Sequence, residues 1–143
     1  MSTEHTNAVV FMCSDGRLHH GKVNAADAVR EYLSVDYTYL IAIPGPDKVL
    51  TRGSAAEQEA ASGQFNLLNE AKSPVVVAVV GHCNCAGNPV TDDEHRNDIT
   101  EAVNIIRDWG YRGEIVGLLQ LHENDTSWPL EEVTRLAADT GTA

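Results

Sequence analysis

Positively charged residues are scarce in this chain of 143 residues. Lysine and arginine together number 10, against 21 aspartates and glutamates, so the formal net charge is -11 at pH 7. A surface of that charge repels phosphate groups, which argues against nucleic acid as a partner. It gives no attraction to an anionic membrane either. A small-molecule substrate remains as the expected partner.

Long apolar runs are missing as well. No stretch approaches the roughly 18–20 apolar residues that a membrane-spanning helix needs. Residues 1–7 lack a basic segment followed by an apolar one, so we expect no secretory signal and a cytoplasmic protein. Hydrophobic residues make up 43% of the chain and charged residues 22%, which is typical of a single folded domain over residues 1–143.

Cysteine is sparse: the three thiols are Cys13, Cys83 and Cys85. An odd number, with two in a Cys-x-Cys arrangement, makes a poor disulfide framework, and without a signal peptide we expect reduced thiols. Reduced thiols beside a histidine, His82, raise the question of metal binding.

Short apolar runs alternate with helical patterns along the chain. Strands are predicted over residues 8–12, 37–43, 75–80 and 114–121, and helices over residues 24–33, 54–72, 92–109 and 129–138. The strand VVVAVV is apolar on both faces, which favours cover on both sides, as in a parallel sheet. This order predicts an α/β fold with a mostly parallel sheet of about four strands flanked by helices.

Two polar loops follow the first and third predicted strands. They read C-S-D-G-R at residues 13–17 and H-C-N-C at residues 82–85. Open parallel sheets place ligand sites at the carboxyl ends of their strands. Catalytic zinc is held by three protein ligands, and the fourth position is left to water. Cys13, His82 and Cys85 would supply such a Cys₂His set.

Each part of this set also has a plainer interpretation. A cysteine at a strand end is often a small buried hydrophobe, and a loop histidine is often only hydrogen-bonded. The combination favours a metal, because both halves end apolar strands in glycine-containing loops. Cys83 is interpreted as a free or packed thiol, since consecutive side chains of an extended chain point apart.

Asp15 and Arg17 follow the first cysteine. An arginine can hold a carboxylate by a bidentate pair, which keeps it ionised and aimed at a neighbouring metal site. The alternative is a solvated ion pair on a surface turn. His19 and His20 come next and are candidates for a proton shuttle, because histidine titrates near neutrality. They are equally compatible with an exposed turn.

The two loops together resemble the β-class carbonic anhydrases, which carry C-x-D-x-R after their first strand and H-x-x-C after their third. The similarity spans residues 8–121. It implies one Zn²⁺ per chain on Cys13, His82 and Cys85, with Asp15 and Arg17 as the catalytic dyad. It further implies a sheet flanked by helices, reversible hydration of CO₂ to bicarbonate by zinc-bound hydroxide, and a homodimer or higher homo-oligomer.

The chain also departs from that family. Residues 42–45 read Ala-Ile-Pro-Gly where many members have Arg-Asn-Ala-Gly, and Gly16 stands where a small hydroxyl residue is usual. The long N-terminal helical arm of many members has no counterpart before residue 8. Two further functions therefore stay open: hydrolysis of CS₂ or COS on the same scaffold, and a non-catalytic zinc site that Asp15 or another side chain closes.

Overall fold

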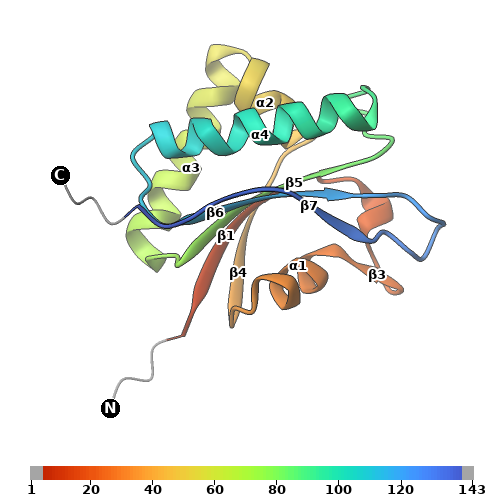
Figure 1. Ribbon diagram of the computed structural model, residues 1–143, viewed down its shortest axis with the longest axis horizontal. Coiled ribbons are helices and arrows are strands. Elements are labelled where there is room, and N and C mark those ends of the chain that lie inside the picture. Colours follow the sequence, from red (N-terminus) through yellow and green to blue (C-terminus); the bar gives the residue numbers. More distant parts are fainter. Residues whose placement is uncertain (1–4, 140–143) are drawn as a thin grey trace.

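The computed structural model describes residues 5–139, which form a five-stranded sheet with helices on both faces (Figure 1). The strand order is β4-β1-β5-β6-β7. The strands are β1 (Asn7–Met12), β4 (Tyr37–Ala42), β5 (Val76–His82), β6 (Glu114–Gln120) and β7 (Leu130–Leu136). The first four are parallel, and β7 runs antiparallel to β6. The predicted α/β class with a mostly parallel sheet is confirmed.

The helices divide between the two faces of the sheet (Figure 1). They are α1 (Ala25–Leu33) on one face, and α2 (Pro46–Arg52), α3 (Ala55–Lys72) and α4 (Asp92–Asp108) on the other. Local signals start them as predicted: the side chain of Asn24 accepts from the backbone N–H of Asp27 at 3.1 Å. Ser54 and Glu57 form a capping box at the start of α3. None of the helices among residues 5–139 is both long and apolar enough to cross a membrane.

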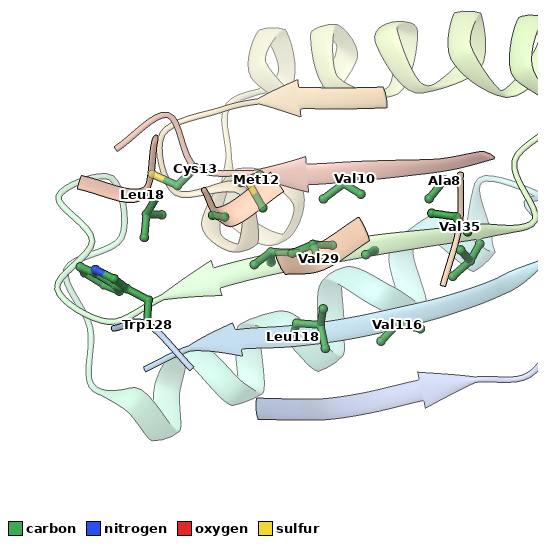
Figure 2. Packing of buried hydrophobic residues seen from close by; sticks show 14 of the residues in the cluster. Ala8, Val10, Met12, Cys13, Leu18, Val29, Val35, Val116, Leu118 and Trp128 are labelled. Atoms are coloured by element: carbon green, nitrogen blue, oxygen red, sulfur yellow. The ribbon is translucent and has the colours of Figure 1, made fainter. Parts of the chain in front are cut away.

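Alternate residues of the central strands feed two separate hydrophobic clusters. Val10 and Met12 of β1 point toward α1, where Leu18, Val29 and Trp128 complete the cluster shown in Figure 2. Both faces of β1 and β5 are therefore covered, which explains why their sequences are apolar without alternation.

The opposite cluster, under α3 and α4, is rich in aromatic rings. Phe11 of β1 stacks on Phe65 of α3, with ring centroids 6.2 Å apart. Trp109 and Tyr111 pack on Phe65 at 5.5 Å and 5.8 Å. The hydroxyl of Tyr111 donates to the carbonyl of Pro74 at 2.9 Å, so this ring is anchored at its polar end as well.

The helix predicted over residues 129–138 is wrong: this segment contains β7. Pro129, which suits the first turn of a helix, favoured the helix, but the pairing with β6 decides the outcome. Without β7, the buried strand β6 would leave one edge of backbone groups unpaired, which costs more than local helix propensity returns. A register shift between Gly117 and Leu118 explains why the strand lacks a clean two-residue alternation. Arg135 of β7 also pairs with Glu114 of β6 at 2.9 Å.

Helix α2 was not predicted from the sequence, and it begins at Pro46, directly after the short turn that follows β4. Gly45 has φ 61 and caps the helix, and Pro46 occupies its first turn, where the missing N–H costs nothing. The segment after β1 is similarly compact, with a 3-10 turn at Gly16–Leu18 and a small antiparallel pair between β2 (His19–His20) and β3 (Val23–Asn24).

Candidate metal centre

The side chains of Cys13, His82 and Cys85 meet where β1 and β5 end. Their possible ligand atoms all lie within 4.8 Å of one another, and all three residues are buried. The strands β1 and β5 are parallel neighbours, so the loops that follow them begin side by side. Among residues 5–139 this is the group of cysteine, histidine and acidic side chains whose spacing suits a metal ion.

The spacing of the two sulfurs matches a tetrahedral zinc site. The Sγ atoms of Cys13 and Cys85 are 3.8 Å apart. Two thiolates that each lie about 2.3 Å from zinc, at a tetrahedral angle, are separated by about 3.8 Å. A disulfide would need a separation of about 2.05 Å, so the pair is arranged for a shared partner and not for a covalent bond.

One ring nitrogen of His82 is free to bind the same metal ion as the two sulfurs. Its Nδ1 lies 2.8 Å from the carbonyl oxygen of Cys83, and because a carbonyl only accepts, Nδ1 carries the proton. Its Nε2 is buried and has no hydrogen-bond partner. A buried lone pair without a partner is costly, and a metal ion would satisfy it.

The two thiols compete for one proton. A hydrogen bond from Cys85 lowers the pKa of Cys13 well below its ordinary value, and the same contact raises the pKa of Cys85. Burial opposes charge on His82, yet contacts with the Cys13 sulfur and the Cys83 carbonyl raise the pKa of that imidazole. The site therefore favours positive charge, and a dication with both thiols deprotonated would remove their competition.

Backbone groups near the two sulfurs favour their ionised form. Those of Gly45 and Asp15 help to lower the pKa of Cys13, and those of Asn88 and Gly87 oppose the rise in the pKa of Cys85. The two loops that carry these groups touch directly, because a Cβ on Gly45 would lie 2.6 Å from the carbonyl carbon of Gly87. Glycine is thus required where the loops meet, both for this contact and for the positive φ of Gly45.

Asp15 and Arg17 form the predicted pair beside this group. Arg17 Nη2 donates to Asp15 Oδ2 at 2.7 Å, and Nε reaches both oxygens at 3.2 Å. These bonds lower the pKa of Asp15 to about 2. Asp15 Oδ2 lies 3.8 Å from His82 Nε2. An ionised carboxylate is therefore held next to the three ligands, with both oxygens engaged by arginine.

Trp128, in the connection between β6 and β7, was missed from the sequence. Its ring lies 5.8 Å from that of His82 and 5.3 Å from the guanidinium carbon of Arg17. Arg17 also donates to the carbonyl of Asn84 at 2.8 Å, so it joins both loops. The misread segment at residues 129–138 hid this role, because the tryptophan only reaches the site when the strand folds back. Figure 2 shows Trp128 and Cys13 at the same end of the sheet.

The remaining polar candidates take different positions. Cys83 is buried outside the three-residue group, and burial raises its pKa to about 11. His19 places Nε2 2.8 Å from the carbonyl oxygen of Cys13. His20 lines an open depression of about 490 Å³ together with Arg17, Trp128 and neighbouring residues.

A mostly parallel sheet with a buried Cys₂His group at its carboxyl end defines an α/β protein with a potential metal site. The chain matches, over residues 3–134, the family described as "Putative carbonic anhydrase", and it belongs to this family. None of the curated proteins matches it. Among solved structures, it is similar to a carbonic anhydrase from Streptococcus mutans, with a TM-score of 0.58 and 14% identity. That match covers 89% of this chain and 81% of the other, and at such low identity it shows the shared fold.

Proposed function

We propose that this protein is a zinc-dependent carbonic anhydrase that hydrates CO₂ reversibly to bicarbonate. The observation that carries the proposal is the buried group of Cys13, His82 and Cys85, with its sulfurs 3.8 Å apart and a free imidazole nitrogen. Those donors are the ones that zinc prefers, and three of them leave one coordination position open. Membership of the family and the parallel-sheet fold support the same activity.

Zinc held by these residues would lower the pKa of water from 15.7 to about 7 and so supply hydroxide at neutral pH. Asp15 then orients the nucleophile, because an ionised carboxylate can accept the hydrogen bond of the attacking O–H group and turn its lone pair toward CO₂. Arg17 keeps Asp15 in this role. Its fork occupies both carboxylate oxygens, which opposes ligation of the metal by Asp15.

Hydration releases a proton that has to leave the site. His20 is the better placed of the two candidate shuttles, because it lines the depression beside Arg17 and Trp128. His19 has its Nε2 against the carbonyl of Cys13. We therefore propose His20 as the group that passes protons to buffer.

We also propose that the protein works as a homodimer or a higher homo-oligomer. Support comes from β4, an edge strand of the sheet on which Tyr37 and Leu40 are 48% and 44% exposed. Exposed edges with large apolar side chains are commonly covered in assemblies. Sedimentation velocity at several concentrations would check this, and a monomer at all of them would contradict it.

The decisive experiment joins metal analysis to stopped-flow CO₂ hydration. We expect one zinc per chain and a rate that rises from about pH 7 to about pH 9, because two thiolates donate more negative charge than histidines and make water harder to ionise. Hydrogen sulfide release from COS or CS₂, without CO₂ hydration, would identify the alternative substrates. Stoichiometric zinc with no activity at any pH would identify a closed, non-catalytic site.

A further inference from the structure

A second polar cluster lies against the metal loops, on the α2 and α4 side of the sheet. It consists of Asp47 and Arg52 from α2, Asn88 from the loop after β5, and His95 and Asp98 from α4. Asp47, Asn88 and His95 are fully buried, and Asp98 is 6% exposed. The motifs that suggested the metal site include none of these residues.

The cluster is bound together by side-chain hydrogen bonds. The Nδ1–H of His95 donates to Asp47 Oδ2 at 2.7 Å, and Asn88 Nδ2 donates to Asp98 Oδ2 at 2.9 Å. Arg52 holds Asp98 through both of its terminal nitrogens and reaches Asn88 Oδ1 at 3.3 Å. Helices α2 and α4 are thereby tied to the loop that carries Asn88.

Two members of the cluster are joined to the loop that carries Cys85. The backbone N–H of Asn88 donates to the carbonyl oxygen of Cys85 at 3.2 Å. Asp47 comes two residues after Gly45, which contacts the same loop closely, because a Cβ on Gly45 would lie 2.6 Å from the carbonyl carbon of Gly87.

The last residue before His82 meets the cluster directly. A Cβ on Gly81 would lie 3.2 Å from Asp47 Oδ2. Consecutive residues of a strand face opposite sides of the sheet, so Gly81 faces the cluster while His82 faces the thiols. The cluster therefore contacts the end of β5, which carries His82, and the loop that carries Cys85.

Stability alone does not explain such a cluster. Buried charges cost desolvation, and well-packed apolar residues of similar volume often stabilise a protein as much or more. What the polar groups add is direction: each fixes the orientation of a neighbouring backbone segment through geometry that apolar packing does not specify.

We infer that Asp47, Arg52, Asn88, His95 and Asp98 form a positioning cluster, which fixes the end of β5 and the loop after it so that His82 and Cys85 keep the geometry of the metal site. This inference rests on the proposed metal site. Ligands bind a metal tightly when their orientation is fixed by neighbouring groups, so the cluster sets how tightly the site holds its ion. It acts through the loops and does not touch the metal or the substrate.

The test compares Asn88→Leu with Val103→Ala, a control in the apolar part of α4. Asn88→Leu keeps the branched shape of the side chain and removes its polar contacts with Arg52, His95 and Asp98. Zinc affinity would be measured by competition with a chromophoric chelator, and Co²⁺ would be bound as a probe of the sulfurs. We expect a 10–100-fold loss of zinc affinity in Asn88→Leu, the range typical of residues that orient metal ligands.

The Co²⁺ spectrum separates positioning from general destabilisation. Loss of the cluster's hydrogen bonds leaves the loop of Cys85 less firmly placed, so the sulfur-to-cobalt charge-transfer band of Asn88→Leu should shift in position or lose intensity. The control should keep both the affinity and the band of the parent. If Asn88→Leu does not fold, Arg52→Lys, which keeps the charge and loses the fork, should show the same changes at a smaller size.

An unchanged band and affinity in a folded cluster variant would overturn the inference, and so would equal changes in Val103→Ala. Both readouts are independent of catalysis. A parent protein that binds metal and fails to hydrate CO₂ would therefore refute the proposed function and leave the positioning cluster standing. A parent protein that binds neither Zn²⁺ nor Co²⁺ would refute both.

Discussion

The two faces of the sheet differ in how they are covered and in what they do. A helix of nine residues, α1, and the short turns near it cover one face (Figure 1). On this face the thiols of Cys13 and Cys85 lie among apolar side chains. Helices α2, α3 and α4 cover the other face, which contains the aromatic cluster around Phe65 and the positioning cluster.

This difference separates access from support. The thinly covered face leaves an open depression lined by Arg17, His20 and Trp128, and Trp128 in turn packs against His82. We expect small molecules to approach the candidate metal centre from this side. The heavily covered face has no candidate ligand side chain among residues 5–139, yet it holds the loops from behind. Changes on the first face should therefore alter chemistry, and changes on the second should mainly alter stability or loop geometry.

Cys85→Ser tests the first face most severely. Loss of a ligand should lower zinc affinity by more than about 100-fold, beyond the effect of residues outside the ligand set, and should reduce CO₂ hydration to background. A chelator should lower the melting temperature of the parent, because a metal that binds only the folded state stabilises it, and should have little effect on Cys85→Ser. Stoichiometric zinc in Cys85→Ser would show that this thiol is not a ligand.

Phe65→Ala tests the second face without touching the loops. Phe65 is 1% exposed and contacts three aromatic rings, so truncation should lower the free energy of unfolding by about 3–5 kcal/mol. Denaturant titration would measure this loss. Zinc affinity of the folded fraction should stay within about twofold of the parent. A large fall in affinity would mean that the two faces are coupled more tightly than the structure indicates.

Asp15→Asn tests whether a residue of the first face binds the metal or only orients the nucleophile. The amide keeps the shape of the carboxylate and removes its charge, so CO₂ hydration should fall by about 10–100-fold, whereas zinc affinity should change only a few-fold. Stopped-flow rates and chelator competition on the same samples would separate the two effects. A parallel collapse of zinc affinity would instead identify Asp15 as a ligand.

His20→Ala should have the smallest effect. Turnover in weak buffer should fall by a few-fold and recover when imidazole is added, since a soluble base can replace the side chain in proton transfer. His5→Ala is the matched control, because His5 lies at the opposite end of the sheet beside Tyr37. Equal rates for the parent and His20→Ala in weak buffer would remove His20 from the mechanism.

Most of the fold could be predicted because its signals are local. Strands form at the apolar runs of residues 8–12 and 75–80. Asn24 and Ser54 cap helices by hydrogen bonds to residues three positions further along the chain. The edge strand β7 could not be predicted in this way. Pro129, directly before it, favoured a helix, and only the unpaired edge of β6 selected the strand.

The same distinction between local and long-range signals applies to the residues of the candidate site. The side chains of Cys13, His82 and Cys85 could be selected from motifs, since each stands at the end of an apolar run and adjacent parallel strands bring such ends together. Trp128 and Asn88 could not be selected. Trp128 lies far along the chain from both cysteines. Asn88 is close to Cys85 in sequence, but its side chain bonds to Arg52 and Asp98 on two helices, which no motif relates to the cysteines.

The sequence by itself determined the donor atoms of this protein and the strands that carry them, because residue type and short-range periodicity are properties of neighbouring positions. Only the tertiary structure decided the separation of the two sulfurs, the free nitrogen of His82 and the polar cluster behind the loops. Those features depend on how buried surfaces from distant segments pack and on where their hydrogen-bonding groups find partners, and neither is encoded within a single stretch of chain.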